Sequence, residues 1–125
     1  MEHGGQRILV VEDDGDLSGL ICLTLEAEGY DVVAAPNGAV ALTEVERHGL
    51  PRVILLDLMM PVMDGVEFVQ RLRESFGSIP GTHIVVMTAR GDVKACADRL
   101  QAHDILGKPF DINDLLSVVA RHAAG

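Results

Sequence analysis

The feature that most constrains this chain is an aliphatic run that stops on a carboxylate. Val53–Leu56 are four consecutive aliphatic residues, and Asp57 follows them. Such a run is typical of a strand buried on both faces, as in a parallel sheet with helices packed on either side. Asp57 then lies at the carboxyl end of the strand, the edge where open α/β sheets bind ligands. A carboxylate at that place needs a partner to offset its desolvation.

The rest of the chain alternates between short aliphatic runs and helical patterns. Further strands are predicted at Arg7–Val11, Asp31–Ala35, His83–Met87 and Asp104–Gly107. Helices are predicted at Leu17–Glu28, Ala39–His48 and Asp92–Ala102. A further helix is predicted to follow a cap at Asp64, and the last helix, Ile112–Ala123, follows a cap at Asp111. The weak apolar face of Asp92–Ala102 indicates the most mobile helix and a moving contact surface. Side chains expected on core-facing helical stripes are Leu17, Leu20, Ile21, Thr24, Leu25, Phe68, Val69, Leu72, Phe76, Ile112, Leu115, Leu116 and Val119.

This alternation predicts an α/β fold with a single doubly wound, five-stranded parallel sheet and five helices. The flavodoxin-like strand order 2-1-3-4-5 places the ends of the first and third strands at the switch point. The polar residues that follow four of the strands then share one edge of the sheet: Glu12, Asp13, Asp57, Thr88 and Lys108.

Length and charge limit the classes of protein that fit. A chain of 125 residues predicts one domain with a real hydrophobic core. Its 19 acidic and 10 basic residues give a net charge of -9, which argues against direct nucleic-acid binding and fits divalent cations or basic partner surfaces. Cys22 and Cys96 are expected to be buried free thiols. No apolar run approaches the roughly 20 residues of a membrane span, so we expect a cytoplasmic protein without membrane contact.

The residues at the shared edge suit phosphoryl transfer to a carboxylate. Asp57 would be the nucleophile and would form an aspartyl phosphate. Glu12 and Asp13 add the hard oxygen ligands that Mg²⁺ prefers. Asp14 and Asp16 are better explained as solvated surface or helix capping, and either of them could cap the next helix. Lys108 would offer a cation to one phosphoryl oxygen, and the hydroxyl of Thr88 would donate to another.

Four ordered motifs carry a resemblance to the receiver domain of bacterial two-component response regulators, of the chemotaxis-regulator kind, over essentially the whole chain, residues 1–125. The motifs are Val10-Val11-Glu12-Asp13-Asp14, Leu56-Asp57-Leu58-Met59-Met60-Pro61-Val62-Met63-Asp64-Gly65, Thr88-Ala89 and Lys108-Pro109-Phe110. The resemblance implies a signalling switch rather than an enzyme. Such a switch catalyses only the phosphorylation and dephosphorylation of its own aspartate. No output domain is expected within this chain.

The resemblance also assigns roles. It implies that Asp57 is phosphorylated from the phosphohistidine of a histidine kinase or phosphotransfer protein. Magnesium would be held by Glu12, Asp13, Asp57 and the backbone carbonyl of Met59. Thr88 resembles the switch hydroxyl and Lys108 the phosphate-pairing lysine, whose bond to Pro109 is expected to be cis. An output protein or domain would then respond to the surface of Asp92–Ala102, Asp104–Gly107 and Ile112–Ala123, which is also a candidate surface for a phosphorylation-dependent dimer.

One position departs from the family pattern. The family's usual aromatic switch residue lies three positions before the lysine, and here that position is Ile105. An isoleucine cannot report through a ring or a phenolic hydroxyl. Phosphorylation is therefore expected to be normal, while the output surface or the size of the population shift differs.

Two other classes of protein stay open. A pseudo-receiver would act as a scaffold without phosphorylation; Ile105 favours it, and the intact Asp57, Asp13, Thr88 and Lys108 argue against it. A phosphohydrolase resembling the haloacid dehalogenases would need a second aspartate two residues after the nucleophile, where this chain has Met59. A dinucleotide-binding module is excluded because no Gly-x-Gly-x-x-Gly loop follows the first strand.

Overall fold

The computed structural model describes residues 6–58, 63–89 and 98–124. Its centre is a five-stranded parallel sheet in the order β2-β1-β3-β4-β5, which confirms the predicted strand order. The strands are β1 (Arg7–Val11), β2 (Asp31–Ala35), β3 (Val53–Asp57), β4 (His83–Thr88) and β5 (Asp104–Gly107). Every residue of β3 is buried, as the unbroken aliphatic run predicts for a central strand.

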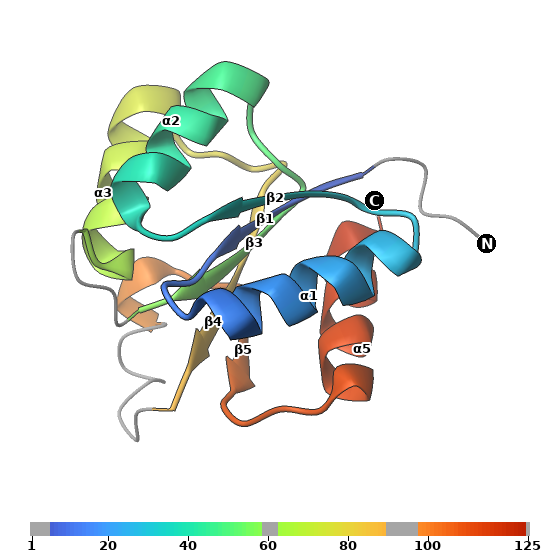
Figure 1. Cartoon of the computed structure of the whole chain (residues 1–125). Coiled ribbons are helices and arrows are strands. Elements are labelled where there is room, and N and C mark those ends of the chain that lie inside the picture. Colours follow the sequence, from blue (N-terminus) through green and yellow to red (C-terminus); the bar gives the residue numbers. More distant parts are fainter. Residues whose placement is uncertain (1–5, 59–62, 90–97, 125) are drawn as a thin grey trace.

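Helices cover both faces of this sheet (Figure 1). They are α1 (Gly15–Ala27), α2 (Gly38–His48), α3 (Gly65–Phe76) and α5 (Ile112–Ala123). One core cluster packs α2 and α3 against the sheet, and the other packs α1 and α5 against the opposite face. The helix expected at Asp92–Ala102 lies mostly outside the described residues, although residues 98–100 are helical.

Short polar side chains start each of these four helices. Asp14, Asn37, Asp64 and Asp111 are the N-cap residues, and each accepts a hydrogen bond from a backbone N–H of the first turn. These bonds satisfy donors that a helix start otherwise leaves unpaired. The expected capping roles of Asp14, Asp64 and Asp111 are confirmed. Of Asp14 and Asp16, either of which could cap α1, Asp14 is the cap, and Asp16 is exposed in the first turn of the helix.

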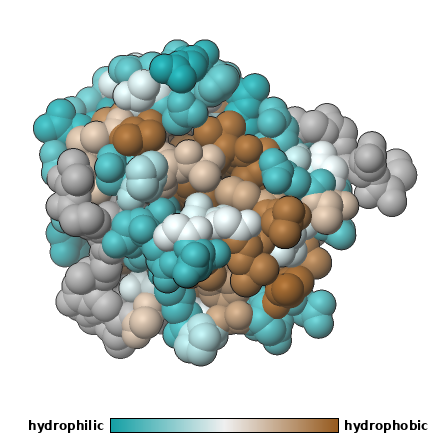
Figure 2. All heavy atoms as spheres, viewed as in Figure 1, coloured by the Kyte–Doolittle hydropathy of each residue, from teal (hydrophilic) through white to brown (hydrophobic). Residues whose placement is uncertain are grey.

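Three side chains predicted to face the core do not. Leu20 is 50% exposed, Phe76 is 37% exposed and Ile112 is 47% exposed. Each lies on the predicted apolar stripe, but the sheet contacts only the middle of that stripe, so residues at its margin or at a helix end stay in solvent. Figure 2 shows apolar atoms on the side of the molecule that carries α1 and α5.

The expected burial of the two cysteines is confirmed only in part. Cys22 is a free thiol but is half-buried rather than fully buried, and its burial raises the pKa of the thiol. Cys96 lies outside the described residues.

Within residues 6–58, 63–89 and 98–124, no helix has the length and apolar character that crossing a membrane requires.

Gly65 allows the start of α3 to lie against the end of β3. A Cβ atom at Gly65 would lie 2.9 Å from Leu58 Cδ2 and 3.1 Å from the Asp57 carbonyl oxygen. We therefore expect Gly65→Ala to lower the free energy of unfolding by roughly 1–3 kcal/mol, because the backbone beside Asp57 must shift. Urea unfolding followed by circular dichroism measures this change.

Gly19→Ala is the matched control for that substitution. Gly19 lies inside α1, and a Cβ there would meet no atom within 4 Å. The control should be stabilising by roughly 0.5–1 kcal/mol, since alanine restricts the unfolded chain and favours the helix. Equal effects of the two substitutions would contradict the packing role of Gly65.

Candidate functional site

Three carboxylates meet where β1 and β3 end. Val11 pairs with Leu56 in the parallel register, so Glu12 and Asp57 leave the sheet side by side. Glu12 is 2% exposed and Asp57 is 4% exposed, whereas Asp13 is exposed. Ligand oxygens of Glu12, Asp13 and Asp57 all lie within 4.8 Å of one another. The sheet therefore assembles the acidic pocket that the sequence predicts at this edge.

Lys108 supplies the cation that the buried carboxylates need. Its Nζ donates to Glu12 Oε1 at 2.6 Å and to Asp57 Oδ2 at 3.1 Å. The lysine follows β5, and its backbone N–H donates to the carbonyl of Thr88 at the end of β4. The peptide bond between Lys108 and Pro109 is cis, as expected. The lysine thus bridges the ends of β1 and β3 from the end of β5, which is two strands from β3 and three from β1.

Burial and hydrogen bonding shift the pKa values of Glu12 and Lys108. Burial raises the pKa of Glu12 above its ordinary value, although the hydrogen bond from Lys108 opposes that rise. Burial works to lower the pKa of Lys108, but hydrogen bonds to Glu12 and Asp57 outweigh it and raise this pKa. The ammonium is therefore fixed in its charged form and offsets part of the acidic charge around Asp57.

Thr88 lies on β4, which is next to β3, and Ile105 lies on β5, the edge strand beyond β4. Thr88 is 3% exposed, ends β4 and pairs with Gly107 of β5, so its side chain belongs to the same edge as the acids. Ile105 is half-buried, pairs with Val86 and packs against the core cluster of α2 and α3. An aliphatic side chain therefore fills part of the space beside β4 at the position where the family usually has a ring.

The carboxylates suit a magnesium ion. Carboxylate oxygens are the hard ligands that Mg²⁺ prefers, and Glu12, Asp13 and Asp57 bring several of them within reach of one ion. The fourth predicted ligand, the carbonyl of Met59, lies outside the described residues. The residues present fit the ion that the sequence predicts.

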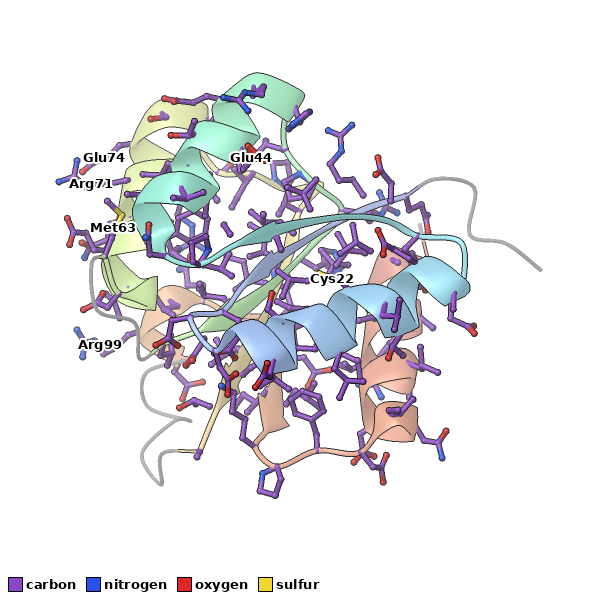
Figure 3. All side chains as sticks on the ribbon, in the orientation of Figure 1. Cys22, Glu44, Met63, Arg71, Glu74 and Arg99 are labelled. Atoms are coloured by element: carbon purple, nitrogen blue, oxygen red, sulfur yellow. The ribbon has the colours of Figure 1, made fainter. Side chains whose placement is uncertain are left out.

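A second polar hollow lies along α3, away from these acids. Arg71, Glu74 and Arg99, labelled in Figure 3, contribute to its lining and are exposed. Arg71 forms an ion pair with Glu67 at 3.1 Å within α3. Exposed pairs of this kind are ordinary solvated surface, so this hollow lacks the buried charge of the site at Asp57.

One group of side chains was not predicted from the sequence. His83, His103 and His122 gather with Asp104 at the opposite edge of the sheet, where β4 and β5 begin and α5 ends. The sequence could have indicated part of this cluster, because His83 and Asp104 are the first residues of two adjacent parallel strands. The position of α5, which brings His122 to the same place, is a tertiary feature.

The chain matches a known protein family over most of its length. The family model of the response regulator receiver domain matches residues 8–120, so the chain belongs to this family of two-component signalling proteins. Its five-stranded parallel sheet, in the order β2-β1-β3-β4-β5, is the fold of a receiver domain.

Particular relatives place the chain within that family. DNA-binding response regulator MtrA of Mycobacterium tuberculosis is 39% identical over 121 residues, which are 95% of this chain and 51% of MtrA. Chemotaxis protein CheY4 of Vibrio cholerae is a structural neighbour with a TM-score of 0.83 and 31% identity, covering 93% of this chain and 97% of that one. NtrX of Brucella abortus has a TM-score of 0.83 at 26% identity, covering 95% of this chain and 27% of that one. The chain spans about half the length of the curated relatives it matches.

Proposed function

We propose that this chain is a phosphorylation-controlled switch in which Asp57 accepts a phosphoryl group from the phosphohistidine of a histidine kinase or phosphotransfer protein. The observation that carries this proposal is the contact of one lysine ammonium with two buried carboxylates, Glu12 and Asp57. A nucleophilic carboxylate beside a fixed cation is suited to accept a dianionic group. An open depression lined by Leu17, Ala89 and Phe110 reaches Lys108 and gives a donor side chain room to approach.

The proposed transfer step uses the side chains of Asp57, Lys108 and Thr88. A carboxylate oxygen of Asp57 forms a bond to phosphorus while the bond from phosphorus to the donor imidazole nitrogen breaks, and the imidazole leaves as a neutral ring after taking up a proton. Lys108 then exchanges its contact with the Asp57 oxygen for a phosphoryl oxygen. The hydroxyl of Thr88 donates to another phosphoryl oxygen.

Magnesium is the cofactor we propose for this step. Glu12, Asp13 and Asp57 would hold it, and the carbonyl of Met59 is a further proposed ligand. When bound, the ion offsets the repulsion between the carboxylates and the incoming phosphoryl oxygens. Lys108 brings one positive charge to the three carboxylates of Glu12, Asp13 and Asp57, so a divalent cation would make the entry of an anionic group easier.

The output of the switch is proposed to act through β5, α5 and the segment before β5. Thr88 and Ile105 lie on adjacent strands, so movement of the threonine toward a phosphoryl group changes the packing beside Ile105. MtrA is named a DNA-binding response regulator, and our proposal for this chain is control of an output protein or domain. A dimer formed through the same surface after phosphorylation is part of the proposal.

Intact-mass measurement after incubation with acetyl phosphate tests the proposed function. The chain should gain the mass of one phosphoryl group when Mg²⁺ is present and should gain little or none when a chelator removes the ion. A chain that gains no phosphoryl group under either condition would contradict the switch and favour the scaffold class that Ile105 suggests.

Thr88→Ala should separate phosphoryl uptake from switching. Loss of the hydroxyl removes a donor to the phosphoryl group but leaves the nucleophile and Lys108 in place. We expect the phosphoryl mass gain to persist, while phosphorylation-induced NMR shifts in β5 and α5 shrink at least about threefold, the equivalent of roughly one lost hydrogen bond.

Thr88→Ser is the control for that experiment, because it keeps the hydroxyl and removes only a methyl group. Its NMR shifts on phosphorylation should remain close to those of the unsubstituted chain. Full shifts in Thr88→Ala would rule out the proposed role of the threonine.

A further inference from the structure

A cluster of imidazole rings lies at the edge of the sheet opposite Asp57, at the starts of β4 and β5. His83 begins β4, His103 precedes β5 and His122 lies in the last turn of α5. The rings of His83 and His103 stack at 4.4 Å between centroids, with 3° between their planes. Nδ1 of His83 lies 3.0 Å from Nδ1 of His122. Nothing in the phosphorylation chemistry uses these groups.

The tautomer of His122 follows from its neighbour Asp104. Nε2 of His122 lies 2.9 Å from Asp104 Oδ2, and an ionised carboxylate only accepts hydrogen bonds. Burial works to raise the pKa of Asp104, but hydrogen bonds from His122 and the Ile105 N–H, together with Arg121, lower it. Nε2 of His122 therefore donates to Asp104, which leaves Nδ1, the nitrogen that faces His83, as the ring atom available to a metal ion.

A carboxylate behind one imidazole is the usual support of a metal-binding histidine. In such sites the carboxylate accepts from the outer ring nitrogen, fixes the ring and makes its other nitrogen more basic. Here Asp104 performs that task for His122, which is only 12% exposed in its side chain. The ring is thus held in place before any ion arrives.

We propose that Nδ1 of His83 and Nδ1 of His122 form a binding site for a transition-metal dication such as Zn²⁺. Two nitrogens bound to zinc at tetrahedral angles lie about 3.3 Å apart, so the present 3.0 Å requires only a small opening of the pair. The proton that bridges the two Nδ1 atoms moves to Nε2 of His83, so both rings stay neutral. Water completes the coordination, since the chain supplies two nitrogen ligands.

The surroundings favour neutral rings and a nitrogen-preferring ion. Burial lowers the pKa values of His83 and His103, with further lowering from His122 and from Arg52 and Arg73 nearby. His103 uses its own Nδ1 to accept from the backbone N–H of Ile84, so it supports His83 by stacking and does not enter the ligand set. Imidazole suits zinc, copper and nickel, whereas Mg²⁺ prefers the carboxylates at the other edge.

Titration of tag-free chain with Zn²⁺ near neutral pH, in excess Mg²⁺, tests the site by calorimetry. We expect one zinc ion per chain, and at least a tenfold loss of affinity in His83→Ala and in His122→Ala. Asp104→Asn should weaken binding by roughly tenfold, the lower end of the effect of such supporting carboxylates. His48→Ala is the matched control, because His48 lies on α2 beside Glu44, away from this cluster, and its removal should leave the affinity unchanged.

NMR of the unsubstituted chain gives an independent readout if an alanine variant fails to fold. Added Zn²⁺ should move the ring resonances of His83 and His122 and leave those of His48 in place. The Asp57→Asn variant should bind zinc as tightly as the unsubstituted chain, which separates this site from the acidic pocket and from the proposed switch. Absence of zinc binding, or unchanged affinity in the double variant of His83 and His122, would overturn the proposal.

Discussion

Asp57→Asn should abolish uptake of a phosphoryl group from acetyl phosphate while the chain stays folded. The amide has nearly the size of the carboxylate but lacks the charged oxygen that attacks phosphorus. Asp57 is 4% exposed at the end of the central strand, and Lys108 Nζ contacts its Oδ2 at 3.1 Å. We expect at least a 100-fold drop in the rate of the mass gain, measured on the intact protein in the presence of Mg²⁺.

Asp64→Asn is the matched control for this experiment. Asp64 is exposed and caps α3 by accepting from the N–H of Glu67 at 2.9 Å. Asparagine caps helices as well as aspartate does, so the control changes the same chemical group without loss of structure. Uptake should be unchanged in Asp64→Asn. Equal uptake in Asp57→Asn and in the unsubstituted chain would show that another acid is the acceptor and would overturn the assignment.

Lys108→Met should lower the free energy of unfolding by roughly 3 kcal/mol when magnesium is absent. Methionine keeps much of the length of the side chain and removes the ammonium. The side chains of Glu12 and Asp57 are 0% and 6% exposed and would lose their shared cation. Removing one partner of a buried ion pair is costly because the remaining charge stays desolvated. Urea unfolding of both chains in a chelating buffer measures the difference.

Two comparisons make this result specific to the buried pair. Arg71→Met breaks the exposed ion pair with Glu67 at 3.1 Å and should cost less than about 1 kcal/mol. Added Mg²⁺ should return part of the stability lost in Lys108→Met, because the ion binds the folded acids and not the unfolded chain. Similar losses in Arg71→Met and Lys108→Met would contradict the view that Lys108 offsets buried charge.

The strands could be predicted from the sequence because they depend on neighbouring residues, whereas α1 and α2 begin at Gly15 and Gly38, slightly before the predicted Leu17 and Ala39. The bounds of β1, β2, β3 and β5 agree with the aliphatic runs, and β4 extends one residue further, to Thr88. Asp64 and Asp111 cap their helices as expected because a cap needs only the backbone of the next turn.

The exposure of particular helical residues could not be predicted in the same way. Leu20, Phe76 and Ile112 follow the apolar period of their helices, yet each is exposed. The period tells which face of a helix is apolar, whereas the width of its contact depends on how the neighbouring elements pack against it. The apolar period of a helix does not determine how other elements pack against it.

The sequence by itself determined the fold class, because the alternation of strands and helices predicts a parallel sheet covered on both faces. The strand order was the flavodoxin-like order expected of that class, and with it the parallel direction of the strands predicts the edge at which Glu12, Asp13, Asp57, Thr88 and Lys108 meet.

Only the tertiary structure decided which side chains pair across long stretches of chain. Lys108 and Glu12 are 96 residues apart and lie 2.6 Å from each other, and His83 and His122 are 39 residues apart with ring nitrogens 3.0 Å apart. Such contacts depend on the distance between strands and on where α5 ends against the sheet. A hydrogen bond forms or fails within a few tenths of an ångström, and only the packed fold sets positions to that tolerance.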